Sequence, residues 1–339
     1  MLNNQDFAQS RAKSLGELPS IQDLEPSSDV QPCEVILNLY EQARRLLKAT
    51  VLKIEGAYSP STIRAYRANF AVFIRYCEEQ GTSPLPCQQE TVTKFIAHLS
   101  NGHLKSASIR IAIVAIAAIH RLNRFEDPSK DPDVVLEVRR MYRKLGRASK
   151  QALGVTQPIL EKLIGVTDYS LRGIRDRMLL LLAYDSLCRR SELVSLRIED
   201  ISNLGTDKGL QIRLCKSKTD PNGVGKWLHL SARTQLAIED WIDASGIEDG
   251  FLIRRMTKHG GILPRGISGG HINRIYKRLA AQAQLDADMV EHISGHSMRV
   301  GSAQDLMNSG ASMPMLMKRG RWTKTDTVMR YVENARVVI

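Results

Sequence analysis

Apolar residues recur at a helical spacing from residue 35 to residue 125. Ser59 followed by Pro60 is typical of an N-cap and the first turn of a helix. Ile109, Ile113 and Ile116 repeat three or four residues apart, as they would on one face of a helix. The pattern predicts four helices, over residues 35–55, 59–81, 88–100 and 106–124. We therefore expect a helical domain over residues 35–126.

Turn-forming residues fill positions 127–132, where Pro128 and Pro132 cannot continue a helix. We interpret this segment as a linker between two domains. Asp131-Pro132 also resembles the start of a further helix, 133–145, which we assign to a second domain over residues 133–339. A second polar stretch, 146–151, follows that helix.

Helical and strand-like patterns alternate beyond residue 156. A very apolar helix is predicted over 171–187, and a short helix carrying Arg189 and Glu192 follows it. Three candidate strands are 198–201, 210–215 and 226–230, of which the last two flank a polar turn and predict a hairpin. Further helices are predicted over 231–244, 268–283, 296–309, 313–319 and around Met329. The predicted fold class is mainly α: an N-terminal helical domain and an α+β domain with a small β-sheet.

The charge of the chain is uneven. Lys and Arg outnumber Asp and Glu by 48 to 36, which gives a net charge of +12 and a pI of about 9.6. This excess indicates a polyanionic partner such as nucleic acid, although a merely basic protein stays an open alternative on composition alone. Residues 1–34 hold two basic and six acidic residues, so the rest carries +16. Prolines interrupt 1–34 and no periodicity runs through it, so we predict a disordered acidic tail.

The five cysteines show no zinc-ligand spacing and their number is odd. We read them as free thiols of a reducing compartment. No signal peptide opens the sequence, and the longest fully apolar run, Ile111 to Ile119, is far shorter than a membrane span. These features predict a cytoplasmic protein that has no contact with a membrane.

His296 and Arg299 are three residues apart, so they share one face of a helix. A proton-transfer group beside a permanent cation suits a phosphate under attack, and Tyr331 is a candidate attacker. The phenol of tyrosine has an ordinary pKa of about 10, so it needs cations nearby to react. On spacing alone, a structural histidine and a partly buried tyrosine remain the ordinary alternatives.

Other candidate groups surround the same chemistry. Arg189 directly follows an apolar run, where a charge is costly unless it has a use, and Glu192 could orient its guanidinium. Arg189 and Arg299 would bind the phosphate oxygens. Lys218, in the hairpin turn, could protonate a leaving oxygen, and Trp322 could donate its indole N–H to a phosphate oxygen. A solvated surface lysine and a core tryptophan are the alternatives.

The segments that hold these residues resemble the tyrosine site-specific recombinases of the phage integrase family, especially its Cre-like phage and plasmid members. The resemblance rests on Ala183–Glu192, Lys216–Thr219, Ser294–Ala303, Gly320–Thr323 and Val328–Tyr331. It assigns the family's catalytic series, in chain order, to Arg189, Lys218, His296, Arg299, Trp322 and Tyr331. Glu192 remains a supporting candidate because of its spacing from Arg189.

The resemblance also implies an activity. Such enzymes cut and rejoin double-stranded DNA at paired inverted repeats through a 3′-phosphotyrosyl link, as a homotetramer on two DNA sites and through a four-way junction. They use no metal ion, no other cofactor and no ATP. Residues 35–126 would then be the core-binding domain and 133–339 the catalytic domain of a nucleoid-associated protein encoded by a bacterium, a phage or a plasmid.

Several basic and polar residues are candidates for contacting DNA. The helix 268–283 corresponds to one that Cre-like enzymes lay in the major groove, but Gly270 stands where a guanine-reading arginine is expected. The remaining candidates on that helix are His271, Asn273, Arg274 and Lys277. In the first domain the candidates are Arg64, Arg67, Lys105 and Arg110. Solvated helix faces are the alternative for these four, and we expect a target sequence different from that of Cre.

The resemblance leaves two rivals. A relaxing topoisomerase would use the same tyrosine chemistry, and a non-catalytic DNA-binding protein could share the fold. Only eight residues follow Tyr331, fewer than in Cre-like enzymes, so the exchange of a C-terminal helix between subunits is in doubt. A metal-dependent nuclease is disfavoured, because no carboxylate cluster accompanies His296 in the sequence.

Overall fold

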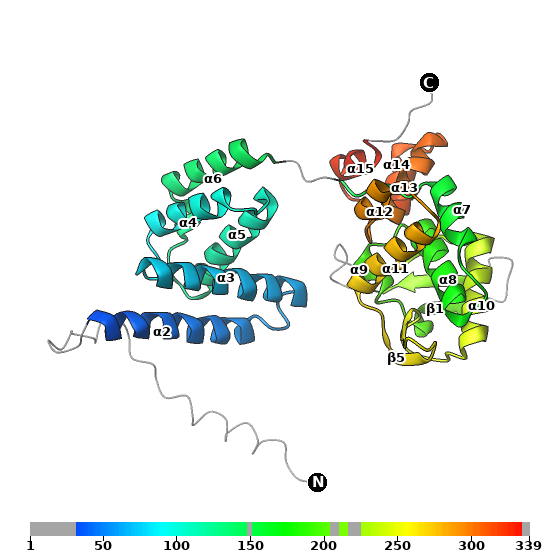
Figure 1. The fold of residues 1–339 in the computed structure, drawn as a ribbon, viewed down its shortest axis with the longest axis horizontal. Helices are drawn as coiled ribbons and strands as arrows, with labels where there is room; N and C mark the ends of the chain where they lie inside the picture. Colours follow the sequence, from blue (N-terminus) through cyan, green and yellow to red (C-terminus); the bar gives the residue numbers. More distant parts are fainter. Residues whose placement is uncertain (1–31, 148–150, 204–209, 216–224, 334–339) are drawn as a thin grey trace, which may run out of the picture. The chain divides into compact units, whose positions relative to one another are not determined.

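The computed structural model describes residues 32–147, 151–203, 210–215 and 225–333. The chain forms two compact units, Met1–Ser149 and Lys150–Ile339, each with its own core (Figure 1). Of the predicted acidic tail, residues 1–34, the structure describes only residues 32–34, which form the start of the first helix. The predicted hairpin turn with Lys218 also lies outside them.

In its described residues the first unit is built of helices, namely α2 (Pro32–Lys53), α3 (Pro60–Gln80), α4 (Gln89–Asn101), α5 (Ser106–Leu122) and α6 (Pro132–Leu145). The four helices predicted there are confirmed. Ser59 caps α3 by accepting the N–H of Thr62 at 3.2 Å, and Gly81 ends it with a left-handed φ of 65°. The core between the helices is built on aromatic and branched side chains, among them Phe70, Phe73, Phe95, Ile109 and Ile116.

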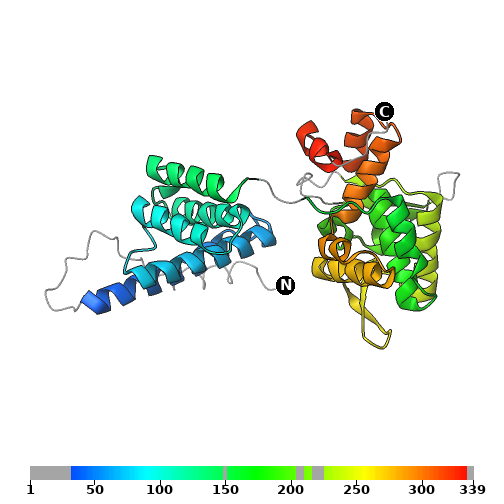
Figure 2. The ribbon, with the colours of Figure 1, turned by 45° about the horizontal axis from the view of Figure 1, so that its top comes forward.

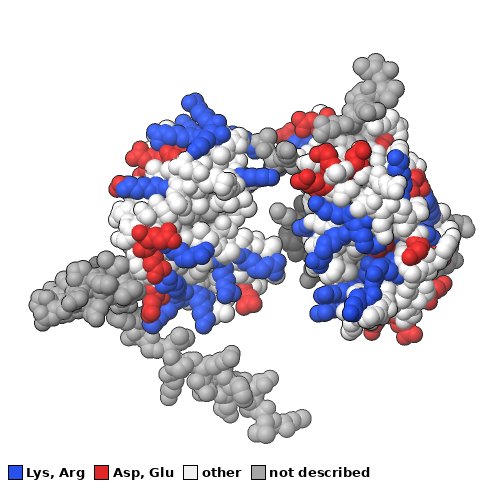
Figure 3. Space-filling model, in the orientation of Figure 1, with Lys and Arg blue, Asp and Glu red and all other residues white. Residues whose placement is uncertain are grey.

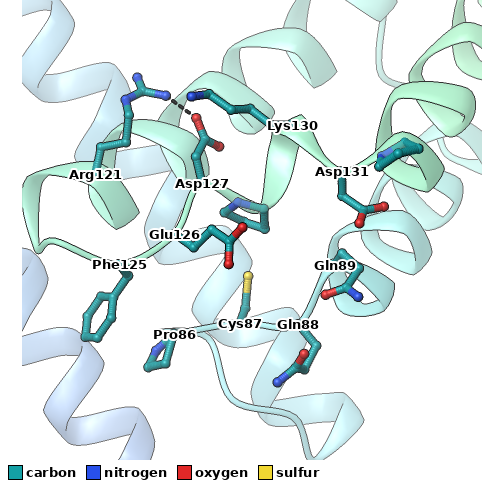
Figure 4. A pocket seen from close by; sticks show the side chains of 12 residues that line it. Pro86, Cys87, Gln88, Gln89, Arg121, Phe125, Glu126, Asp127, Lys130 and Asp131 are labelled. Atoms are coloured by element: carbon teal, nitrogen blue, oxygen red, sulfur yellow. Dashed lines mark hydrogen bonds and ion pairs between the residues drawn. The ribbon is translucent and has the colours of Figure 1, made fainter.

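Residues 127–132 are packed into the first unit and do not link two domains. Asp127 caps a 3₁₀ turn, η2 (Pro128–Lys130), by accepting the N–H and the hydroxyl of Ser129 at 3.0 and 2.7 Å. Asp127 also forms an ion pair with Arg121 on the wall of an open hollow of about 780 Å³ (Figure 4).

The helix that follows, α6, therefore corrects the expected domain boundary. Val134 and Met141 of α6 are buried in the first core, and α6 packs along α4. The division falls at residues 149 and 150, in the second polar stretch.

The second unit combines nine described helices with two small sheets. The helices are α7 (Gln157–Gly165), α8 (Leu171–Ser186), α9 (Arg190–Leu193), α10 (Ala232–Ser245), α11 (Gly269–Gln282), α12 (Ala287–His292), α13 (Ser297–Asn308), α14 (Met313–Gly320) and α15 (Thr325–Val332). One sheet has the order β1 (Ile201–Asn203), β2 (Leu210–Leu214), β3 (Lys226–Trp227), all antiparallel, with Arg213 opposite Trp227. β4 (Arg254–Met256) and β5 (Ile262–Gly266) pair separately.

The mainly α fold class is confirmed, including the pairing of the last two predicted strands. Residues 198–200 form a 3₁₀ turn ahead of β1, so the first predicted strand begins later than expected. The helices α7 and α12 and the β4–β5 pair were not predicted. The β4–β5 residues are all partly or fully exposed, so they show no alternation of apolar and polar positions that could identify a strand.

Two apolar clusters fill the second unit. The larger surrounds α8, which is buried from Met178 to Ala183 and lies beside α10 in both views (Figure 1; Figure 2). The smaller brings Leu187 together with Trp322, which lies between α14 and α15, and with side chains of α13, α14 and α15, namely Ala303, Leu316, Val328 and Val332. Because both clusters meet at Leu187 and Cys188, the loop between α8 and α9 is held from two sides. Within the described residues, no helix combines the length and apolar character of a bilayer span.

Candidate active site

The loop that carries Arg189 is tightly held. Leu187 ends α8 with a left-handed φ of 47°, which turns the chain sharply. Arg189 is the N-cap of α9, and the carboxylate of Glu192 accepts both its backbone N–H at 2.8 Å and its Nη1 at 2.7 Å. Although burial acts to raise it, hydrogen bonds from Arg189 and the charge of Arg321 hold the pKa of Glu192 below its usual value. Glu192 thus orients Arg189, as the sequence predicts.

Arg299 lies on the first turn of α13 and is only 1% exposed. Its Nη1 donates to the carbonyl of Leu187, and its Nη2 donates to the carbonyl of Gly320 at 2.7 Å. Burial and the nearby charge of Arg189 lower the pKa of Arg299 to about 10, so the side chain stays charged at neutral pH. This buried cation connects the loop before α9 to the end of α14.

Trp322 and Tyr331 stack around that cation. The guanidinium carbon of Arg299 is 4.6 Å from the Trp322 ring centre and 5.4 Å from that of Tyr331. The two rings are 5.0 Å apart. Gly320 is required here, because a Cβ at this position would lie 2.0 Å from the Trp322 ring. The geometry therefore joins α13, α14 and α15 at one point.

His296 precedes α13 and remains exposed to solvent. The protein packed around its ring and the charges of Arg299, Arg190 and Arg189 lower its pKa. At neutral pH the imidazole is therefore neutral and can accept a proton. His296 is the N-cap of α13, three residues before Arg299.

The structure thus brings five of the six predicted catalytic residues together, and Lys218 lies outside the described residues. Two donors of this group, Nε of Arg299 and Nε1 of Trp322, are buried and have no hydrogen-bond partner within the described part of the chain. A buried donor without an acceptor is costly, so these groups suit a ligand rich in acceptors, such as phosphate. No three His, Cys, Asp or Glu side chains among the described residues are placed to hold a metal ion.

Arg321 is part of this network and was not singled out from the sequence. Its guanidinium donates to Glu192 Oε2 at 3.1 Å and to the carbonyl of Leu187 at 3.2 Å. In the sequence, Arg321 follows Lys318 and Arg319, so it looks like one more solvated charge at a basic helix end. Only the fold shows that it points inward.

The candidate DNA-reading residues of α11 fall into two groups. Asn273 Oδ1 accepts the N–H of Gly295 at 2.7 Å, and Lys277 Nζ donates to the carbonyl of Glu291 at 2.8 Å. These two side chains therefore hold the segment before His296. Arg274 and His271 instead line a hollow of about 210 Å³ with four further arginines, Arg172, Arg175, Arg255 and Arg278. Figure 3 shows basic side chains gathered over the part of the second unit where α9, α11 and β5 lie.

The candidates of the first unit are all exposed. Arg64 and Arg67 lie on α3, Lys105 immediately precedes α5, and Arg110 lies on its second turn. None of the four forms an ion pair with another described residue, although nearby Lys94 pairs with Glu90 at 2.9 Å. Their charges are therefore available to a polyanion, while their role in DNA binding stays a prediction.

Known proteins share this architecture. "Recombinase cre" of Escherichia phage P1 is 28% identical over 294 residues, which cover 82% of this chain and 85% of that protein. The "Integrase/recombinase xerD homolog" of Selenomonas ruminantium is 26% identical over 308 residues, 88% of each chain. The structure of XerH site-specific recombinase bound to palindromic difH substrate has the same fold, with a TM-score of 0.60 at 16% identity over 91% of this chain and 87% of that one.

Family profiles match both units. The Phage integrase N-terminal SAM-like domain matches residues 49–125, within the first unit. The Phage integrase family profile matches residues 155–336, which include Arg189, Glu192, His296, Arg299, Trp322 and Tyr331. With more than half of its residues in this one match, the chain belongs to the phage integrase family of tyrosine recombinases.

Proposed function

We propose that this protein is a site-specific DNA strand transferase that uses Tyr331 as its nucleophile. The phenolic oxygen attacks the scissile phosphorus, the bond to the 5′-oxygen breaks, and a 3′-phosphotyrosyl link and a free 5′-hydroxyl result. Attack by a 5′-hydroxyl of a second strand reverses these changes and releases the tyrosine. The observation that carries the proposal is the Arg299 guanidinium held 5.4 Å from the Tyr331 ring and bonded to the Arg189 loop.

Each group has a role in that reaction. Arg189 and Arg299 bind the non-bridging oxygens and stabilise the charge that develops on them, and Trp322 adds its indole N–H. His296, held neutral by its surroundings, takes up a proton beside the phosphate. We assign the protonation of the leaving 5′-oxygen to Lys218 on the family resemblance. Since arginine supplies the positive charge and the phosphotyrosine conserves the bond energy, the scheme includes neither a metal ion nor ATP.

The wider assembly is part of the proposal. XerH is described in complex with a palindromic substrate, and a lambda integrase dimer is described on a core site. By analogy, we propose that this chain binds paired inverted repeats as a homotetramer and exchanges strands through a four-way junction. The exposed basic residues of the first unit and Arg274 and His271 of α11 would contact the DNA. The setting would be the nucleoid of a bacterium, with the gene on a chromosome, phage or plasmid.

The first experiment needs no known target. The full chain is mixed with a random pool of duplexes, each nicked so that a cleaved fragment diffuses away. DNA that stays attached after denaturation is sequenced, with Tyr331→Phe as the control. We expect only the wild type to trap DNA, and the trapped sequences to share an inverted repeat.

Other outcomes would favour the rivals. Covalent trapping by Tyr331→Phe would refute the nucleophile. Enrichment of one sequence by both proteins without covalent attachment would indicate a DNA-binding protein on this fold. Trapping without any shared sequence would favour a relaxing topoisomerase.

A further inference from the structure

We propose that Arg321 is a positioning residue that fixes the orientation of Arg189 and Arg299, the two arginines of the phosphate clamp. The inference rests on the proposed function and concerns a residue outside the catalytic series predicted above. Arg321 follows α14 and directly precedes Trp322. Its side chain is 6% exposed, so the whole guanidinium is enclosed by the site.

Arg321 contacts the three residues that come immediately before Arg189. Its Nη1 donates to the carbonyl of Ser186 at 2.9 Å, and its Nη2 donates to the carbonyl of Leu187 at 3.2 Å. Nη2 also lies 3.4 Å from Cys188 Sγ. One planar side chain thus supports the whole turn between α8 and α9 and fixes the path by which Arg189 enters the site.

Arg321 reaches Arg189 a second time through Glu192. One oxygen of Glu192, Oε1, accepts Arg189 Nη1, and the other, Oε2, accepts both the Arg189 backbone N–H and Arg321 Nη2. Arg189 therefore holds both oxygens of the carboxylate, and Arg321 adds a second, charged donor at Oε2. Removal of Arg321 would leave Oε2 with the backbone N–H of Arg189 alone, so the carboxylate that orients the Arg189 guanidinium would be held less firmly.

The charge balance supports the same role. A carboxylate that binds Arg189 alone would cancel the positive charge that the phosphate needs. With Arg321 on the same carboxylate, the group Arg189, Glu192 and Arg321 keeps a net charge of +1, and Arg299 brings it to +2. Glu192 can then orient Arg189 without neutralising the clamp.

Arg299 also donates to Leu187, the residue whose carbonyl accepts from Arg321. The carbonyl of Leu187 accepts Nη1 of Arg299 as well as Nη2 of Arg321, so one peptide group orients two guanidinium groups. A displacement of Leu187 after removal of Arg321 would therefore be felt by Arg299 and by the rings stacked on it. The orientations of Arg189 and Arg299 therefore both depend on the side chain of Arg321.

Two features of Arg321 are unfavourable in free energy, which indicates that its side chain has a role in the site. Its φ of 55° lies in the left-handed region, which glycine adopts without strain. Its Nε is buried and has no partner among the described residues. An ordinary helix end would take glycine here and leave no buried charge.

The test uses the inverted-repeat duplex recovered by covalent trapping, nicked beside the scissile phosphate. Single-turnover cleavage and DNA affinity are measured for wild type, Arg321→Met and Arg321→Lys. The matched control is Arg319→Met, which removes a neighbouring arginine that donates to the carbonyl of Asp185 at 3.4 Å and does not contact Glu192. A second substrate carries a methylphosphonate at the scissile position, which lacks one charged oxygen.

We expect Arg321→Met to cleave the ordinary phosphate about 10- to 100-fold more slowly at unchanged DNA affinity. Arg321→Lys should recover part of the rate because it keeps the charge. The deficit of Arg321→Met should shrink on the methylphosphonate, since a weaker clamp matters less when less charge develops. Arg319→Met should cleave like the wild type. If Arg321→Met unfolds, Arg321→Gly replaces it, because glycine suits the backbone at this position.

Cleavage by Arg321→Met at the wild-type rate would overturn the inference. An equal deficit on both substrates would overturn it too, since that indicates general damage and not a weakened clamp. Absence of any covalent product with the wild type would contradict the proposed function itself, and the inference would fall with it.

Discussion

The cations of the two units are held in opposite ways. In the second unit Arg299 and Arg321 are buried, and Arg189 is mostly so, and carbonyls or Glu192 fix all three. In the first unit Arg64, Arg67, Lys105 and Arg110 extend into solvent without ion pairs to other described residues. A held cation has its hydrogen bonds arranged before the substrate arrives, so it stabilises a transition state at little reorganisation cost. A free cation attracts a polyanion from a distance.

The difference predicts that removal of a held cation affects the chemical step. Arg189→Ala should slow single-turnover cleavage by about 10²- to 10³-fold, equivalent to roughly 3–4 kcal/mol of transition-state stabilisation. DNA affinity should change little, because many other groups bind the duplex. The control is Arg197→Ala, an exposed arginine that pairs with Glu199 at 3.3 Å. Near-normal cleavage by Arg189→Ala would contradict the idea that the held cations of the second unit act on the chemical step.

Removal of free cations should instead affect binding. The double variant Arg64→Gln, Arg67→Gln should bind the target about tenfold more weakly at moderate salt, and the slope of log affinity against log salt should fall by about 0.9 for each phosphate that the variant no longer neutralises. Cleavage at saturating DNA should stay at the wild-type rate. Lys94→Gln on α4 is the control, since Lys94 already pairs with Glu90. An unchanged salt slope would mean that this face does not meet the DNA backbone.

The smallest predicted effect concerns a titratable group of the first unit that is held like the arginines of the second. His120 is fully buried, accepts the N–H of Cys87 at its Nε2 at 3.1 Å, and places Nδ1 at 2.8 Å from the carbonyl of Ile116. Burial lowers its pKa, so the folded protein keeps the ring neutral. The unfolded chain binds the proton first, at a pKa of about 6.5, and stability therefore falls as the pH drops below that value.

Urea unfolding of the full chain between pH 8 and pH 5 measures this effect. We expect a decrease on the order of 1 kcal/mol in the stability of the first unit over that range. His120→Gln should flatten the dependence, and His103→Gln, at an exposed position after α4, should leave it unchanged. The same slope in His120→Gln as in the wild type would assign the pH dependence to another group.

The sequence predicts the elements whose signals are local. The start of α3 at Pro60 and its end at Gly81 follow from a capping serine, a first-turn proline and a left-handed glycine. The prediction of a linker at residues 127–132 was wrong. Asp127 and Pro128 indicate a turn, but they do not show whether that turn is packed against a domain or lies between two domains. Only the burial of Val134 and Met141 shows that α6 belongs to the first unit.

The site shows the same limit. The candidate series comes from motifs that the family resemblance orders, and the structure brings together those members that it describes. The contacts of Arg321 and the use of Asn273 as a support for Gly295 have no counterpart in the local sequence. Each of these contacts joins residues that are far apart in the chain, so neither could be predicted from periodicity or spacing.

The distance along the chain between the parts of the site has a consequence for protein synthesis. Arg321 lies 134 residues after Leu187, and Tyr331, on α15, comes later still. A growing polypeptide can bury the large cluster around α8 before α15 has left the ribosome. Until then it lacks both the phenol and the side chains that close the small cluster over Leu187. On the proposed function, a chain shortened by a premature stop before α15 would therefore lack the nucleophile and could not cut DNA.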